Sequence, residues 1–431
     1  MSSERIITVR ALTRVEGEGA LHVRLDGDEV EDVRLSIYEA PRFFEAFLRE
    51  RSIEDVPDLT ARICGICPVA YQMSSVHALE AALGITITPT IRRLRRLMYC
   101  GEWIESHSLH VFLLHAADFF GCASGIELAR QFPQQVNDGL QIKQAGNALL
   151  EVLGGRAIHP VNVRIGGFHR LPAAGELTAL LPKLREARSA AIAAADWIAE
   201  FEFPACEFEC EWVALTHPDE YPMNAGLIGS TRFPAIEVDE FEDHFEETQV
   251  HHSTALHATR RERQTPYLLG PLSRLNLNRD RLRKPAREIA QRLLPQRVIH
   301  NRFLSIAARL VEIVHCLDEA IESIQDYRAE GEASCRYAAR SGRGCAATEA
   351  PRGTLYHAYE ISDDGRVRRA KIVPPTSQNQ RQIETDLAHF LPAVLDQPDD
   401  QIALSCEKLI RSYDPCISCS THFLKLTMER R

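Results

Sequence analysis

The pattern of apolar and polar positions changes along the chain from strand-like to helix-like. In residues 21–37, apolar residues alternate with polar ones around Asp26 and Gly27, which predicts a half-buried β-hairpin. Later segments carry apolar residues three and four positions apart. These predict long core helices, over residues 41–82, 91–118, 139–153, 176–200 and 285–327. The last segment is long enough for one bundle helix or for a pair of helices.

Two other segments, 203–282 and 341–380, are richer in Pro, Gly and aromatic residues and predict loops and minor strands. We therefore predict an α+β protein that is mainly α, with a large helical core and small peripheral antiparallel sheets. No repeat or low-complexity linker divides the chain, so we expect one unit. Its regions are a hairpin and sheet region (1–40), the helical core (41–202 and 283–330), a loop- and strand-rich region (203–282), a C-terminal region (331–422) and a short tail (423–431).

Composition narrows the class of protein. The 431 residues are 45% hydrophobic, which is enough for a sizeable core, and the formal net charge of −10 argues against a nonspecific nucleic-acid surface. No segment reaches the roughly 18 uninterrupted apolar residues of a membrane-spanning helix, and the N-terminus has no apolar stretch of signal-peptide length. The 12 cysteines are too sparse for a disulfide scaffold, so we expect a reducing compartment, the cytoplasm.

Two Cys-x-x-Cys pairs stand near opposite ends of the chain, Cys64/Cys67 and Cys416/Cys419. The spacing within each pair lets both sulfurs face one metal, and thiolates suit zinc, copper(I), iron–sulfur clusters and other soft transition-metal sites. Structural zinc motifs place their half-sites roughly 15–20 residues apart. The much longer separation here requires a large core as scaffold, although a structural zinc site and a thioredoxin-like redox pair remain alternatives.

Several polar motifs offer chemistry that such a centre would need. Glu16, beside Gly17, could accept a proton from a metal thiolate, or it could lie in a surface turn. Glu45 stands among aromatic residues, where its charge needs a cationic partner. Arg352, between Pro351 and a glycine, can only donate hydrogen bonds, either to an anionic ligand or in a surface salt bridge.

Together these motifs resemble the large, catalytic subunit of nickel-iron hydrogenases over nearly the whole chain. RVEGEG, RFFE, RICGIC, GGRAIHP, EAPRG, VPPTSQN and DPCISCSTH occur in that family's order. The short length and the PVAYQMSSVHALE continuation are most similar to the cytoplasmic multisubunit branch that couples dihydrogen to NAD(P). The resemblance implies an oxidoreductase that cleaves dihydrogen reversibly and heterolytically into protons and electrons.

The resemblance also implies a ligand set. Cys64 and Cys416 would be terminal thiolates on nickel, while Cys67 and Cys419 would bridge nickel to an iron that holds carbon monoxide and two cyanides. Glu16 would relay protons from Cys416 towards solvent.

The same resemblance implies the surroundings of this nickel-iron centre. Arg352 would lie over the bimetallic site beside Pro351, held by Asp118 and Asp414, and Thr376 would hydrogen-bond a cyanide. The first base could be the thiolate of Cys416, the guanidinium of Arg352, or both.

A second metal site is implied nearby. Glu45, His422 and the backbone oxygen of Ile372 match a magnesium site, sometimes occupied by iron. This chain departs from the family at Tyr71: many members have a histidine there, four residues after the second cysteine of the first pair. His77 does not restore that spacing.

The resemblance implies partners as well. Apart from the four cysteines assigned to the nickel-iron centre, the chain has no ferredoxin-like run of cysteines. An iron–sulfur small subunit would therefore carry the electrons, and flavin- and NAD(P)-binding subunits would receive them. Nickel-insertion chaperones and an endopeptidase that cuts after His422 would mature the chain and remove residues 423–431. The alternatives are a dihydrogen sensor with the same centre, or a noncatalytic scaffold with a structural metal.

Overall fold

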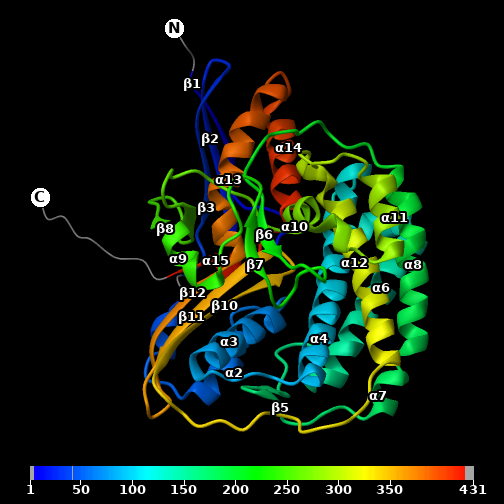
Figure 1. Cartoon of the computed structure of the whole chain (residues 1–431). Coiled ribbons are helices and arrows are strands. Elements are labelled where there is room, and N and C mark those ends of the chain that lie inside the picture. Colours follow the sequence, from blue (N-terminus) through cyan, green and yellow to red (C-terminus); the bar gives the residue numbers. More distant parts are fainter. Residues whose placement is uncertain (1–3, 41, 423–431) are drawn as a thin grey trace, which may run out of the picture.

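The computed structural model describes residues 4–40 and 42–422, so the expected tail lies outside the described residues. One side of the molecule is a helical bundle (Figure 1). It consists of α4 (Pro89–Ser108), α6 (Pro133–Gly154), α8 (Leu181–Ala199), α11 (Lys284–Leu293) and α12 (Ser305–Gln325). Of the two alternatives for residues 285–327, one bundle helix or a pair, the structure has the pair, because Pro295 and the loop after it separate α11 from α12.

The predicted hairpin is also confirmed and gains a third strand. Strands β1 (Glu4–Val9), β2 (Gly19–Asp26) and β3 (Glu29–Ile37) form an antiparallel sheet in that order. A second antiparallel sheet contains β10 (Gly342–Ala350), β11 (Gly353–Ile361) and β12 (Val367–Val373). Its strands are long, so the prediction of minor strands understates this region.

The prediction of one long helix over residues 41–82 is wrong. The segment forms α1 (Phe44–Leu48), α2 (Val56–Ala61) and α3 (Pro68–Leu83), with a loop between α2 and α3 that contains Cys64 and Cys67. Pro68 opens α3 because proline suits the first turn of a helix and not its interior. Helix α3, which begins directly after this loop, packs against β10 and β11 of the second sheet.

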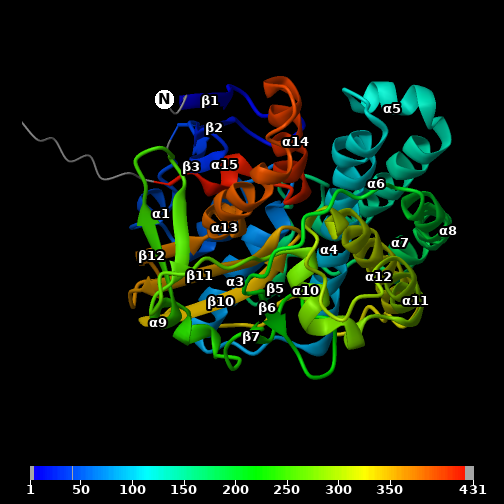
Figure 2. The same cartoon turned by 90° about the horizontal axis from the view of Figure 1, so that it is seen from above.

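The C-terminal part returns to the N-terminal sheet. Helix α13 (Pro375–Phe390) packs on β3, α14 (Asp399–Ser412) packs on β1, and the short α15 (Ile417–Ser420) follows. In both views α15 lies near the N-terminal sheet (Figure 1 and Figure 2). The chain therefore brings residues from its two ends to one place, beside the loop before α3.

The remaining elements are short. The helices are α5 (Gly125–Gln131), α7 (Ala174–Thr178), α9 (Phe241–His244) and α10 (Pro271–Asn278). Three two-stranded sheets pair β4 (Val163–Arg164) with β5 (Gly167–Phe168), β6 (Val213–Thr216) with β7 (Leu227–Ser230), and β8 (Phe245–Gln249) with β9 (Leu256–Arg260). A π-helical turn, η2 (Leu109–His115), continues α4, and single 3-10 turns are η1 (Ile53–Asp55), η3 (Ala116–Phe120), η4 (Val238–Glu240), η5 (Arg279–Arg281), η6 (Arg302–Leu304) and η7 (Leu391–Ala393).

Within residues 4–40 and 42–422, no single helix is long and apolar enough to cross a membrane. One pair of helical segments, 89–120 and 125–131, meets the test of length and composition, and the two segments are bent by 75° relative to each other.

Candidate metal centre

The four cysteines of the two pairs meet in the interior. The Sγ atoms of Cys64 and Cys416 lie 3.6 Å apart, Cys67 Sγ lies 2.8 Å from Cys64 Sγ, and Cys419 Sγ lies 2.7 Å from Cys416 Sγ. All four side chains are buried, and none forms a disulfide. Four sulfurs that converge on one point form a soft donor set suited to a thiophilic transition metal.

The first pair is positioned by backbone amides and by a buried carboxylate. The N–H groups of Ile66 and Cys67 donate to Cys64 Sγ at 3.3 and 3.0 Å. Burial alone would raise the pKa of Cys64, but hydrogen bonds from the neighbouring thiols and the charge of Arg352 bring it well below the ordinary value. Glu102, from α4, accepts hydrogen bonds from the N–H groups of Val69 (2.7 Å) and Ala70 (3.1 Å) and so caps α3 directly after the loop.

The second pair is positioned by the N-terminal segment. Glu16 and Cys416 form an isolated parallel bridge, in which the N–H of Ile417 donates to the backbone oxygen of Glu16 at 3.0 Å. Gly17 has a φ of 89°, and a Cβ there would lie 2.7 Å from the Cβ of Ile417. Only glycine combines this backbone conformation with so close an approach to α15.

The Glu16 carboxylate faces the second pair. The thiol of Cys416 lies 3.2 Å from Oε2, which also accepts from the N–H of Ser418 at 3.0 Å. Oε1 accepts from the Ser418 hydroxyl, which also lies 3.2 Å from Oε1 of Glu39. Since Glu39 is only half-buried, this series of contacts leads from Cys416 towards the surface.

Arg352 is held beside the cysteines by Asp414. Its Nε donates to the backbone oxygen of Asp414 at 2.7 Å and its Nη2 to Oδ1 at 3.0 Å, while Nη1 lies 3.4 Å from the Ser106 hydroxyl. Burial would lower the pKa of Arg352, but Asp414 and the cysteines Cys416, Cys67 and Cys64 raise it well above the ordinary value. The guanidinium is therefore a fixed cation.

The turn that carries Arg352 is fixed from behind by a second buried arginine. Arg274 donates to the backbone oxygens of Ala350 (3.0 Å) and Pro351 (2.9 Å). Its charge is balanced by Glu312 and Glu349, at 2.7 and 2.9 Å. These contacts fix the backbone of the turn, so the arginine above the cysteines is pre-positioned.

Thr376, at the start of α13, also contacts the second pair. Its Oγ1 accepts a hydrogen bond from the N–H of Cys416 at 3.0 Å. That bond does not use the hydroxyl hydrogen, which is free to donate to a ligand held by the cysteines.

Comparisons with known proteins agree with this geometry. A family model for nickel-dependent hydrogenases matches residues 42–138 and 253–422. The chain belongs to this family. The expected resemblance and the α+β, mainly helical fold class are thereby confirmed, and the four-cysteine cluster fits a nickel-iron centre.

Relatives of this hydrogenase chain match it over nearly its full length. It is 34% identical to the sulfhydrogenase 2 subunit alpha of Pyrococcus furiosus, over 98% of this chain and 100% of that protein. It is 25% identical to the NAD-reducing hydrogenase HoxS subunit beta of Cupriavidus necator, over 97% and 95%. The crystal structure of an NAD+-reducing NiFe-hydrogenase in the H2-reduced state has a TM-score of 0.88 and 28% identity, over 98% of this chain and 100% of that one.

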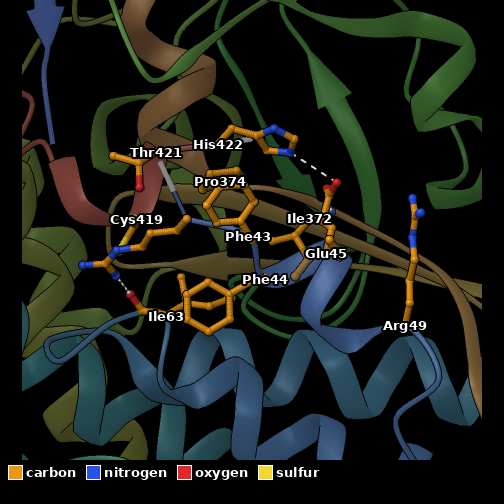
Figure 3. A pocket seen from close by; sticks show the side chains of 12 residues that line it. Phe43, Phe44, Glu45, Arg49, Ile63, Ile372, Pro374, Cys419, Thr421 and His422 are labelled. Carbon is orange, nitrogen blue, oxygen red and sulfur yellow. Dashed lines mark hydrogen bonds and ion pairs between the residues drawn. The ribbon is translucent and has the colours of Figure 1, made fainter. Parts of the chain in front are cut away.

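The three residues expected at a second metal site also lie close together. His422 Nε2 lies 3.2 Å from Oε2 of Glu45 (Figure 3). The N–H of Ile372 donates to Oε1 of Glu45 at 2.8 Å. Burial alone would raise the pKa of Glu45, but His422, Lys371 and the Ile372 amide bring it below the ordinary value. The three residues border a cavity of about 100 Å³ that Cys419 also lines.

One expectation needs correction. Asp118 does not hold Arg352: its carboxylate pairs with Arg411 at 2.8 and 2.9 Å, with Arg14 at 2.5 Å and with His115 at 3.1 Å. Asp118 lies in the 3-10 turn η3, which follows α4 and the π-helical turn η2. Asp118 therefore ties α14 to the segment before Glu16.

Sequence reasoning missed several residues of the hydrogenase site. Glu102 had one signal, because it is a charged residue within the predicted helix over 91–118, where burial demands a partner. Arg274 had none, since its segment predicts loops and minor strands. Ser106, Ser418 and Glu39 also had none, since single serines and glutamates are common at positions without a functional role. Tyr71 lies in the core with a hydroxyl that has no hydrogen-bond partner among the described residues, and burial and the cysteine charges raise its pKa well above the ordinary value.

Proposed function

We propose that Cys64, Cys67, Cys416 and Cys419 hold a nickel-iron centre whose iron carries carbon monoxide and cyanide, and that the chain cleaves dihydrogen reversibly and heterolytically there. The observation that carries the proposal is the convergence of four buried sulfurs beside a fixed arginine and a carboxylate. When bound, the centre supplies the two-electron redox chemistry. The first pair would provide one terminal and one bridging thiolate, as would the second pair.

The protein residues would handle the proton. Arg352 is paired with Asp414 through two of its nitrogens, and an arginine so paired is a poor base. This favours the thiolate of Cys416 as the first proton acceptor. Glu16, 3.2 Å away, would take the proton next and release it through Ser418 towards Glu39.

Arg352 and Thr376 would stabilise the charge of the cofactor. The guanidinium lies beside the cysteines at the end of a fixed turn, next to Pro351, so its charge needs no reorganisation during the reaction. The Thr376 hydroxyl would donate its hydrogen to a cyanide, because the bond from the N–H of Cys416 uses only a lone pair of the oxygen.

The set of Glu45, His422 and Ile372 would bind magnesium, or iron. In a β-strand the N–H and C=O of one residue point to the same side, so the carbonyl of Ile372 faces the same side as the N–H that contacts Glu45. Carboxylate and carbonyl oxygens, with water in the adjoining cavity, suit a hard cation.

The electrons would leave through partner chains. Among the described residues, the only group of three or more cysteines at ligand distance is the one already assigned. An iron–sulfur small subunit would accept the electrons, and flavin- and NAD(P)-binding subunits would follow. The relative named an NAD-reducing hydrogenase supports NAD as the final acceptor. Such a complex would work in the cytoplasm, where NAD(P) is available, after nickel-insertion chaperones and an endopeptidase acting after His422 have matured the chain.

Infrared spectroscopy and metal analysis of the purified complex test this proposal. We expect bands of metal-bound carbon monoxide and cyanide, one nickel per chain, and dihydrogen-dependent reduction of NAD or NADP. Zinc without nickel would instead indicate a structural site. The infrared bands without nucleotide reduction, in a complex that contains a kinase in place of a flavin subunit, would identify a dihydrogen sensor.

A further inference from the structure

A second cluster of metal-ligand types lies outside the sites described above. His252 belongs to the loop between β8 and β9, His257 to β9, and Glu384 to α13, against which β9 packs. One ligand atom from each residue can be chosen so that all lie within 4.8 Å of one another. Neither the four-cysteine centre nor the pair formed by Glu45 and His422 uses any of these three residues.

The distances are close to those of a metal site. Nε2 of His252 lies 2.7 Å from Oε1 of Glu384, and Nδ1 of His257 lies 3.7 Å from Oε2. A tetrahedral zinc ion with bonds of about 2.0–2.1 Å holds its nitrogen and oxygen ligands roughly 3.3 Å apart. The two observed distances lie on either side of that value, so each imidazole is within about 1 Å of the separation from the carboxylate that a zinc ion requires.

His257 is buried without a hydrogen bond from its imidazole to any described residue. Its side chain is 3% exposed, its Nε2 has no hydrogen-bond partner among the described residues, and its Nδ1 is beyond hydrogen-bond distance of Glu384. Burial lowers its pKa to about 4, so the imidazole is neutral at physiological pH, the form that binds metals. A hydrogen bond between His252 and Glu384 accounts for those two residues and leaves the His257 ring without a hydrogen bond among the described residues.

The surroundings orient the carboxylate and leave one side open. The N–H of Leu35, on β3, donates to Oε1 of Glu384 at 2.9 Å, the kind of contact that fixes a metal-bound carboxylate. His252 is 20% exposed, so water can reach a further coordination position there. Among the described residues, the arginine or lysine within ion-pair distance of the carboxylate is Arg381, at 3.6 Å from Oε2; its side chain is 55% exposed and can turn into solvent.

We propose that His252, His257 and Glu384 bind a divalent cation of the zinc type, with water as a further ligand. Two imidazoles and one carboxylate form a donor set that zinc prefers, with one position left open. The assignment does not depend on the proposed function of the four cysteines, because it shares no ligand with them.

A cation at this position would secure the segment that ends at His422. The loop of His252 continues to Thr254, whose N–H donates to the backbone oxygen of Ile37 at 2.7 Å and whose backbone oxygen accepts from the N–H of His422 at 3.0 Å. The cation would tie this loop and β9 to α13. It would therefore stabilise the surface on which the last described residue lies.

Metal binding to the purified complex tests the proposal. The probes are Zn²⁺, counted per nickel by elemental analysis, and Co²⁺, whose visible d–d absorption reports a tetrahedral site. The substitutions are His257→Gln and Glu384→Gln, and the matched control is His251→Gln, at the exposed histidine next to His252. We expect wild type and the control to bind one Zn²⁺ or Co²⁺ per chain beyond the nickel centre, and both site variants to lose it.

Nickel content and the infrared bands are measured in the same samples. They should be unchanged in both site variants, which separates loss of this cation from loss of the main centre and shows that the variants fold. The assignment is overturned if wild type binds no additional Zn²⁺ or Co²⁺. It is equally overturned if His257→Gln binds as much as His251→Gln.

Discussion

Replacing Glu16 with glutamine tests the proton path most directly. The amide keeps the shape of the side chain, and by exchanging donor and acceptor roles it can still bond to the N–H and hydroxyl of Ser418. At most one hydrogen bond is weakened, a cost of about 0.5–1.5 kcal/mol. The centre should therefore assemble, with unchanged nickel content.

The rate effect should be much larger. A positioned proton acceptor contributes about 10²–10⁴-fold, or roughly 3–5 kcal/mol of barrier. The thiol of Cys416 lies 3.2 Å from the Glu16 carboxylate, close enough for direct transfer. We expect Glu16→Gln to slow exchange between dihydrogen and deuterated water by at least about 100-fold, within the range for general acid–base catalysis.

The assay is isotope exchange followed by mass spectrometry, with infrared spectra taken from the same samples. Glu18→Gln is the matched control, because Glu18 is an exposed carboxylate two residues away. Glu16→Asp keeps the basicity and should recover part of the rate. Exchange as fast in Glu16→Gln as in Glu18→Gln, with intact infrared bands, would refute the path through Glu16.

Three further substitutions test the surroundings. Arg352→Lys should leave nickel content unchanged but lower turnover by about 10²–10³-fold, because an ammonium cannot copy the planar donor pair; turnover equal to wild type would contradict this. Arg274→Met should destabilise the complex by about 3–5 kcal/mol, because it strands two buried carboxylates, and the thermal midpoint should fall far more than in the exposed control Arg368→Met. Burial would raise the pKa of Asp118, but His115 and Arg411 bring it below the ordinary value of 3.8. The stabilisation by the ionised carboxylate is therefore present above pH 3.8 and is lost as the pH falls below that value. The difference in thermal midpoint between wild type and Asp118→Asn should shrink between pH 7 and pH 3, and a constant difference would contradict this.

Much of the fold could be predicted from the sequence, because the apolar pattern of each segment matched the secondary structure that the segment forms. Alternation around Asp26 and Gly27 specified a hairpin, and three- and four-residue spacing specified the bundle helices. The helix predicted over residues 41–82 failed because apolar spacing continues through the loop of Cys64 and Cys67, while Pro68 restarts the helix there. Periodicity reports which face is buried, and a buried loop satisfies it as well as a helix does.

For the metal site, too, the sequence predicted some features and could not predict others. The motifs identified the four cysteines, Glu16 and Arg352, because these residue types at these spacings point to metal and proton chemistry. They could not reveal that Asp118 pairs with Arg411 and Arg14, because an ion-pair partner is chosen by the path of the chain in space. The same holds for the role of Arg274, which depends on backbone oxygens that no sequence pattern marks.

The parallel bridge between Glu16 and Cys416 has a consequence for the timing of assembly. A chain emerging from the ribosome presents Cys64 and Cys67 long before Cys416 and Cys419, and the strand-like contact that seats α15 needs Glu16 and Cys416 together. Non-local pairings of this kind form late in folding, since the intervening chain must first be ordered. No nascent fragment that lacks residues 416–419 holds the complete set of four sulfurs, so loading of the four-cysteine site has to wait until those residues have been made and folded back.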